Sequence, residues 1–200
     1  GSLADRLLHN AAVEAAIREL ELDNESLGAA LAAQNATDVT KLVALQKADG
    51  GWGWCFSDES DPWISGQALL SLVRATELGY EVDAVAIENG AIYIQSQLQD
   101  VDQIGDAAEA NRQAFFLYVI AETGMDINEE ADALFEEHRA LLDAYAKALL
   151  AMAYEAAGAS GANQEALLVD LNDEVIMSAT GAHWEDEEQD FLNLSSNIRG

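Results

Sequence analysis

The sequence predicts an all-α protein. Apolar residues recur at steps of three and four almost throughout, the chain is rich in alanine, and only one proline interrupts its 200 residues. No sustained alternation of apolar and polar residues is present. A chain of this length that is 50% hydrophobic can bury a full core, and we expect one domain spanning residues 1–200.

The first two helices are expected at residues 3–21 and 25–46. Leucines and alanines form an apolar stripe along the first segment, and Asp23 or Asn24 provides an N-cap for the second. The polar stretch Asn35-Ala36-Thr37 is the one soft point at which the second helix can pause.

The pattern changes after residue 45. The chain there reads Gln46-Lys47-Ala48-Asp49-Gly50-Gly51-Trp52-Gly53-Trp54 and then, after a polar bend, Ser60-Asp61-Pro62-Trp63. Glycine and proline favour turns, whereas the three tryptophans favour burial. We therefore predict a compact loop, here named the aromatic loop, that plugs one end of a helical array.

The later helices follow a recurring boundary. Asp61-Pro62 predicts the start of a third helix that ends at Gly79. A turn glycine followed by a capping side chain recurs at Gly79, Gly124 and, more loosely, Gly158. This repetition predicts stacked helical hairpins, giving about seven or eight helices in all. The remaining helices are expected at 83–98, 106–123, 128–138, 141–157 and 163–177.

The charge excludes two classes of partner. The chain carries 37 acidic against 9 basic residues, a net charge of -28. Binding to nucleic acid or to anionic lipid relies on clustered lysine and arginine, so neither partner is expected. The acidic residues are spread over all the helices, which indicates a solvated surface suited to a salty environment.

Cysteine content and hydropathy add further limits. Cys55 is the only cysteine, which excludes an internal disulfide. No apolar run approaches the roughly 20 residues of a membrane span, and the N-terminus lacks a signal-peptide pattern. Gly1-Ser2 is typical of a cloning remnant, and residues 195–200 stop where another helix would begin. We therefore expect a domain excised from a larger multidomain protein.

No complete catalytic, cofactor or metal site is visible, so we assign no catalytic, cofactor-binding or metal-ligating residue. Cys55 lies between aromatic residues amid acids that disfavour a thiolate, and is interpreted as structural. His9 and His138 have no second histidine at ligand spacing and are expected at the surface or rim. The three tryptophans of the aromatic loop are interpreted as packing anchors, with a ligand cage as the alternative.

Two acidic groups have alternative interpretations. His183 with Glu185, Asp186, Glu187 and Glu188 offers mixed ligands for a divalent cation, but the regular spacing of a calcium loop is absent, and a solvated acidic turn is preferred. Asp170, Asp173 and Glu174 are similar to the metal-binding acids of isoprenoid enzymes. Their order differs, and the neighbouring leucines explain the segment as an amphipathic helix.

The aromatic loop carries a family resemblance. Residues 46–54 with Asp61-Pro62-Trp63 and the following Ser65-Gly66-Gln67-Ala68-Leu69-Leu70 resemble the thioester-containing helical domain of bacterial alpha-2-macroglobulin-like proteins. The segment from Ala179 to Glu185 looks like a degenerate second copy of the aromatic loop, and its Gly-Ala-His-Trp-Glu ending, followed by residues 192–196, is similar to a later loop of that domain. The resemblance implies an α/α toroid of helical hairpins, complete or incomplete as a ring, of the terpenoid cyclase and protein prenyltransferase type.

The resemblance also implies a function. The family traps proteases, and its reactive motif Cys-x-Glu-Gln forms an internal thioester. That motif is absent here, because Cys55 is followed by Phe56-Ser57-Asp58 and Gln67 is not its partner on any spacing that the family uses. We expect a non-enzymatic fragment that docks other domains of the same parent chain and meets target proteases through the parent. The location implied is extracellular, at the cell surface or periplasmic.

A second resemblance defines the alternative. The spacing Gln46-x-x-x-Gly50-x-Trp52 is similar to the Gln-Trp motif of triterpene cyclases, which are built on the same kind of toroid. Those enzymes protonate a polyene with an Asp-x-Asp-Asp group, of which Asp58-Glu59-Ser60-Asp61 is a distant imitation. A shared fold does not transfer the reaction. A terpene cyclase-like or prenyltransferase-like enzyme is therefore the alternative function.

Overall fold

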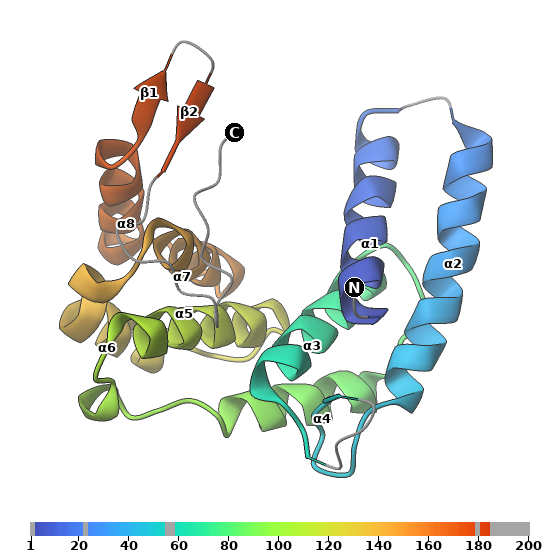
Figure 1. Ribbon diagram of the computed structural model, residues 1–200, viewed down its shortest axis with the longest axis horizontal. Helices are drawn as coiled ribbons and strands as arrows, with labels where there is room; N and C mark the ends of the chain where they lie inside the picture. The colour runs from blue at the N-terminus through green and yellow to red at the C-terminus, as the bar shows by residue number, and fades with distance from the viewer. Residues whose placement is uncertain (1–2, 22–23, 55–58, 179–180, 185–200) are drawn as a thin grey trace. The chain divides into compact units, whose positions relative to one another are not determined.

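The protein is all-α, as predicted. A computed structural model describes residues 3–21, 24–54, 59–178 and 181–184, and this part of the chain contains eight α-helices and one short β-hairpin (Figure 1). The chain divides into two compact units, residues 1–97 and 98–200. One domain over residues 1–200 stays a prediction.

The first unit contains four helices, whose starts follow local capping rules. Three of these helices have side-chain caps: Asn24, Asp61 and Asp83 each accept a hydrogen bond from a backbone N–H of the first turn. Pro62 occupies the first turn, where its missing N–H costs nothing. The helices are α1 (Leu3–Glu19), α2 (Glu25–Ala44), α3 (Pro62–Glu77) and α4 (Ala84–Gln95).

Helix α3 is the centre of the first unit, because α1, α2 and α4 all pack on it. Near the start of α1, the Ala4 carbonyl accepts a 3.0 Å bond from Ser71 Oγ, which is buried in α3. Towards the other end of α1, the Arg18 guanidinium donates to the Leu78 carbonyl, the C-cap of α3, at 2.8 Å. These two contacts show that α1 and α3 run in the same direction.

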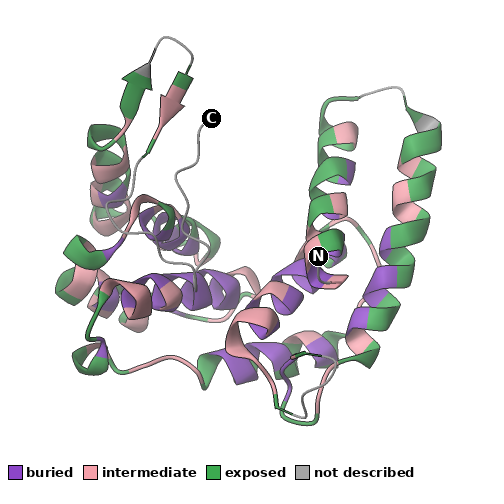
Figure 2. Cartoon of the chain, viewed as in Figure 1, coloured by how far each residue is buried: buried purple, intermediate pink, exposed green. Residues whose placement is uncertain are grey.

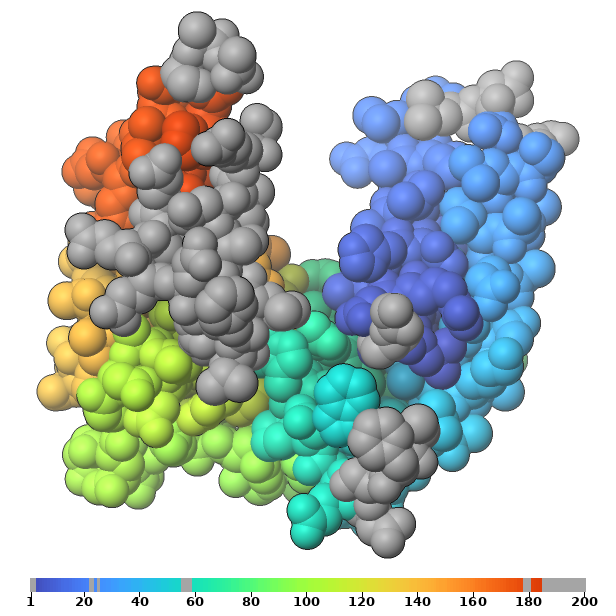
Figure 3. Space-filling view, in the orientation of Figure 1, coloured from blue at the N-terminus to red at the C-terminus, as the bar shows by residue number. Residues whose placement is uncertain are grey.

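A buried carboxylate joins α1 to α2, whose atoms are in contact in Figure 3. Asp38 has no exposed surface and accepts two bonds from the Arg6 guanidinium, at 2.8 and 2.7 Å, and a third from Gln34 at 2.8 Å. The bonds from Arg6 hold the pKa of Asp38 below its ordinary value, although burial acts in the opposite direction. Asp38 is therefore ionised and paired in the folded chain.

A second buried carboxylate explains why α2 does not pause. The side chain of Asn35 donates to Glu14 of α1 at 2.8 Å, and the Tyr80 hydroxyl donates to the same carboxylate at 2.6 Å. Glu14 also forms an ion pair with Arg18. Because Asn35 is held by this partner on α1, it does not bond to its own backbone, and α2 continues unbroken. The predicted pause at Asn35 is wrong.

The second unit is built around α5 (Ala107–Glu122). This helix is buried along most of its length (Figure 2) and packs most extensively on α7 (Ala144–Ala156). Helix α6 (Asn128–His138) contacts α5 and α7, and α8 (Ala162–Asp173) packs on α7. Two short 3-10 helices, η1 (Val101–Gln103) and η2 (Arg139–Leu141), complete the helical part of this unit.

The end of the described chain differs from the prediction. Helix α8 ends at Asp173 and not at residue 177, and Ile176–Ser178 (β1) pairs antiparallel with Gly181–His183 (β2). Val175, Ile176 and Met177 follow the C-cap Glu174, and such residues suit either a helix face or a strand when the run is short. The sequence pattern alone did not distinguish the end of a helix from a short strand.

The predicted turn glycines are confirmed. Gly79, Gly124 and Gly158 each follow a helix with positive φ angles of 89°, 83° and 66°. After α3 and α7, the N–H that follows the glycine bonds back five residues to a helix carbonyl, from Tyr80 to Ala75 and from Ala159 to Tyr154. The same cap thus ends a helix in each unit.

Within the described part of the chain, no helix is long and apolar enough to cross a membrane.

Stability is expected to rise with salt. Salt shortens the range of carboxylate repulsion, from about 10 Å at 0.1 M to about 3 Å at 1 M. The melting temperature, followed by circular dichroism, should therefore increase with added NaCl at pH 7. At about pH 4, near the pKa of free carboxyl groups, the charge falls and the increase should be smaller. Equal salt dependence at both pH values would show that charge repulsion is not the cause.

The Asp38–Arg6 pair is expected to make a pH-dependent contribution. The pKa of Asp38 is lowered in the folded state, so the pair stabilises fully above the unfolded-state pKa of about 3.9. This stabilisation is lost as the pH falls through the lower, folded-state pKa. In urea unfolding, the difference in free energy between the wild type and Asp38→Asn should be largest at pH 7 and shrink in acid. A difference that stays constant with pH would contradict the ion pair.

Candidate functional site

The aromatic loop lies between α2 and α3, and the side chain of Trp52 fixes its position. The indole is only 2% exposed, and its Nε1 donates a 2.7 Å hydrogen bond to the Leu42 carbonyl. Leu42 lies in the last turn of α2, where backbone carbonyls lack the usual partner four residues on, and its carbonyl also accepts a 3.2 Å bond from the Leu45 N–H. One side chain therefore fills a buried space and also completes the end of α2.

The backbone of Trp52 is bound to the start of α3. Its N–H donates to Ser65 Oγ at 2.7 Å, and its carbonyl accepts from the Asp61 N–H at 2.8 Å. Ser65 has no exposed surface, so this hydroxyl is placed inside the unit to bind the loop. Asp61 also caps α3 by accepting from the Ile64 N–H at 2.9 Å.

The loop reaches α4 through Gln46 and two glycines. Gln46 Nε2 donates to the carbonyls of Gly50 and Ala86, at 2.9 and 2.8 Å. Gly50 has a φ of 89° and presses against the Asn89 backbone of α4, where no side chain would fit. A Cβ on Gly90 would lie 3.0 Å from the Trp52 ring and 3.1 Å from Leu69, so any side chain there would force these neighbours to shift. The Gln-x-x-x-Gly-x-Trp spacing thus joins α2, the loop and α4.

Asp49 joins two parts of the aromatic loop by hydrogen bonds. Its Oδ1 accepts from the Gly51 N–H at 3.0 Å and from Ser60 Oγ at 2.8 Å. The bond from Gly51, followed by that from Ser60, lowers the pKa of Asp49. The carboxylate therefore stays ionised and links the two halves of the aromatic loop.

The other tryptophans of the loop behave differently. Trp54 is 56% exposed, so the prediction that all three tryptophans of the loop are buried is wrong for this one. Trp63 is partly buried at the start of α3, and its Nε1 lies 3.2 Å from the amide oxygen of Gln67 when that amide is oriented to donate to Asp5. Gln67 therefore links α3 to α1.

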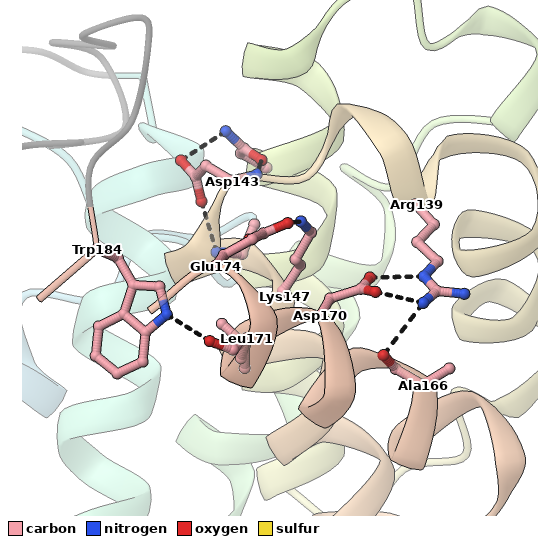
Figure 4. A network of polar contacts seen from close by, with 10 residues as sticks. Arg139, Asp143, Lys147, Ala166, Asp170, Leu171, Glu174 and Trp184 are labelled. Atoms are coloured by element: carbon pink, nitrogen blue, oxygen red, sulfur yellow. Dashed lines mark hydrogen bonds and ion pairs between the residues drawn. The ribbon is translucent and has the colours of Figure 1, made fainter. Parts of the chain in front are cut away.

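Trp184, in the second aromatic segment, repeats the main contact of Trp52. Its Nε1 donates a 2.7 Å bond to the carbonyl of Leu171, in the last turn of α8 (Figure 4). Leu171 and Leu42 occupy the same position, third from the end of their helices. Trp184 remains 39% exposed, so it is much less buried than Trp52 in the aromatic loop. The shared contact is nevertheless in line with a degenerate repeat.

A polar network behind Trp184 joins α5, η2, α7 and α8 (Figure 4). Asp143 caps α7 by accepting from the Ala146 N–H at 2.7 Å, and also accepts from Asn111 Nδ2 at 2.8 Å. Lys147, which is largely buried, forms an ion pair with Glu174 beyond the end of α8. None of these contacts was predicted from the sequence.

Two acidic residues at the end of α8, Asp170 and Glu174, form ion pairs with basic side chains of the same chain. Arg139 Nε donates to Asp170 at 2.7 Å, which lowers the pKa of that carboxyl, and Glu174 is paired with Lys147. Asp173 is exposed. Asp170 and Glu174 are therefore each paired with a basic side chain of the chain.

The remaining candidates lie apart from one another. The His9 ring bonds to the Asp5 carbonyl within α1, and His138 Nε2 donates to the Val101 carbonyl at 2.7 Å. His183 lies in β2, while its acidic neighbours at 185–188 are outside the described residues, as are Cys55 and Asp58. Among the described side chains, no three histidine, cysteine, aspartate or glutamate residues are grouped to hold a metal.

Solved structures share this arrangement of helices. Salmonella alpha-2-macroglobulin reacted with methylamine superposes on 98% of the chain with a TM-score of 0.68 at 22% identity. The chain shares its fold with a segment of bacterial alpha-2-macroglobulin. Trypsin-activated alpha-2-macroglobulin from Escherichia coli matches 83% of the chain, with a TM-score of 0.65 and 22% identity. The native E. coli protein from domain MG7 to its C-terminus matches 79%, with a TM-score of 0.62 and 23% identity.

The likeness concerns a small part of alpha-2-macroglobulin. The chain spans 12% of the Salmonella and trypsin-activated E. coli chains, and 26% of the E. coli portion that begins at domain MG7. No protein-family model matches the sequence, and no curated protein matches it. The resemblance stated from the aromatic loop is thus confirmed at the level of fold.

Trp52 and Trp54 form a matched pair for testing the loop. Trp52→Ala removes a fully packed indole and should destabilise the chain by about 3 to 5 kcal/mol. Trp54→Ala, at an exposed position, should change the free energy of unfolding by less than about 1 kcal/mol. Urea unfolding followed by circular dichroism measures both. Equal effects would show that Trp52 does not anchor the loop.

Proposed function

We propose that the chain is a helical domain of the thioester type within an alpha-2-macroglobulin-like endopeptidase inhibitor. The observation that carries the proposal is the superposition on 98% of the chain with alpha-2-macroglobulin. The related structures are described as activated by trypsin and reacted with methylamine, so those proteins respond to a protease and to an amine. The aromatic loop supports the proposal, since it carries the resemblance in the sequence.

The role proposed for this segment is structural and non-enzymatic. The sequence has no Cys-x-Glu-Gln, so no thioester residue is assigned to it. Gln46 and Ser65 link the aromatic loop to α4 and α3, and Asp49 links two parts of the loop itself. Such a scaffold suits a domain that shelters or docks its neighbours until a protease cuts the parent.

The proposal includes the α/α toroid and a single domain over residues 1–200. Helix α1 packs on α3 in the first unit, and α5 packs on α7 in the second. Each of α2, α4 and α8 packs on one of these central helices: α2 on α1, α4 on α3 and α8 on α7. A ring of helical hairpins requires this arrangement, with one helix of each hairpin packed on its counterpart in the next hairpin and the other helix packed outside it. The pairing within each unit supports the toroid, whose closure remains a proposal.

The proposed partners are the other domains of the parent chain and, through the parent, the target proteases. Leu168 and Val169 of α8 and Met177 of β1 are exposed, and large exposed apolar side chains suit contact with a neighbouring domain. The proposed location is extracellular, at the cell surface or periplasmic. Nucleic acid remains excluded by the charge of -28.

No contact in the described part of the chain favours the cyclase or prenyltransferase alternative. Asp61, the last acid of the imitation motif, caps α3. The Gln-Trp spacing binds helices together through Gln46 and Trp52. Both residue groups that suggest the cyclase are therefore explained by packing of the helices.

The full-length parent protein provides the test. Incubation with trypsin should trap the protease, so that trypsin co-elutes with the parent and loses activity against a protein substrate while still cleaving a small peptide substrate. If the parent carries Cys-x-Glu-Gln, methylamine should add to it and release one thiol. The isolated 200-residue chain should incorporate no methylamine, because it lacks the motif.

The control is trypsin inactivated with an active-site reagent, which cannot cut the parent and should not be trapped. A parent that is cut but leaves trypsin free and fully active on protein substrates would overturn the proposal. A parent that traps trypsin without taking up methylamine would support the form that has no thioester.

A further inference from the structure

Three segments of the chain have the sequence Asn-x-Ser/Thr, which is the acceptor signature for N-linked glycans. They are Asn24-Glu25-Ser26, Asn35-Ala36-Thr37 and Asn193-Leu194-Ser195. The last lies outside the described residues. The other two lie on the same helical segment but in opposite environments, so the structure distinguishes between them.

Asn24 has the environment of an acceptor. It is exposed, as is Ser26, and it occupies the N-cap position of α2. Its side-chain oxygen caps α2 by accepting from the Leu27 N–H at 3.3 Å, and also accepts from Ser26 Oγ at 3.4 Å. The Asn24 Nδ2 group, which would receive a glycan, is not used in either bond.

Asn35 has the opposite environment. It has no exposed surface and lies inside α2, and its Nδ2 donates to the buried carboxylate of Glu14 at 2.8 Å. The hydroxyl of Thr37 is also engaged, since it donates to the Ala33 carbonyl at 3.0 Å. A glycan attached to Asn35 Nδ2 would have to displace the hydrogen-bonded contact with Glu14 that joins α2 to α1.

We propose that Asn24 is an N-glycosylation site and that Asn35, despite the same signature, is not. The proposal rests on the export of the parent chain that the proposed function includes, since glycans of this kind mark secreted surfaces. The ligand class is an oligosaccharide carried on a polyprenyl phosphate or pyrophosphate.

The reaction is a substitution at the first sugar of that carrier. Asn24 Nδ2 forms a bond to the anomeric carbon, and the bond between that carbon and the phosphate oxygen breaks. The phosphate group leaves with the electron pair, and Nδ2 gives up one proton. The side-chain oxygen keeps its lone pairs, so the cap on the Leu27 N–H survives in the glycosylated chain.

The folded 200-residue chain is the substrate for the test. We would treat it with a purified oligosaccharyltransferase that requires only Asn-x-Ser/Thr, together with its lipid-linked oligosaccharide. Asn193→Gln would be present throughout, because that position lies outside the described residues. Intact mass and peptide mapping should show one glycan, on the peptide that contains Asn24.

Two variants and two peptides serve as controls. Ser26→Ala keeps Asn24 but removes the hydroxyl of the signature, and should lose the glycan completely. Asn35→Gln should leave glycosylation at Asn24 unchanged. Isolated peptides around Asn24 and around Asn35 should both be modified, because neither is folded.

An unmodified Asn24 in the folded chain, beside a modified Asn24 peptide, would overturn the proposal, as would a glycan on Asn35 of the folded chain. This assay uses no protease. Its failure is therefore distinct from a failure of the parent protein to trap trypsin.

Discussion

The first unit depends on the burial of one indole at the end of one helix. Trp52 fills a space against α4 at Gly90, while its Nε1 completes the last turn of α2 at Leu42 and its backbone binds Ser65 of α3. Trp52 therefore contacts α2, α3 and α4. A hydrogen-bonded aromatic group can do this because it combines a large apolar surface with a single directional donor.

Local rules predicted much of the fold. The caps at Asn24, Asp61 and Asp83 and the left-handed turn at Gly79 follow from short stretches of sequence, because each satisfies the backbone of its own helix end. The short hairpin after α8 was missed. Its three-residue strands carry too few residues to show a period of two against a helical background.

Side-chain environments were harder to predict. Trp52 and Trp54 have similar neighbours in sequence, yet Trp52 is buried against the Leu42 carbonyl and Gly90, whereas Trp54 is 56% exposed. Asn35 looked like a break in α2 because its partner, Glu14, lies on another helix. The pairing of Lys147 with Glu174 likewise joins residues far apart in the chain. Such contacts appear only once the helices are assembled.

Helix α5 has a consequence for the dynamics of the second unit. From Ala114 to Ala121 every residue is buried, so no side of this stretch faces water. Local fraying cannot expose its amide hydrogens, which exchange with solvent only when the surrounding helices separate. The rate of deuterium uptake along α5 therefore reports the opening free energy of the whole unit, while the termini of α8 report only local motion.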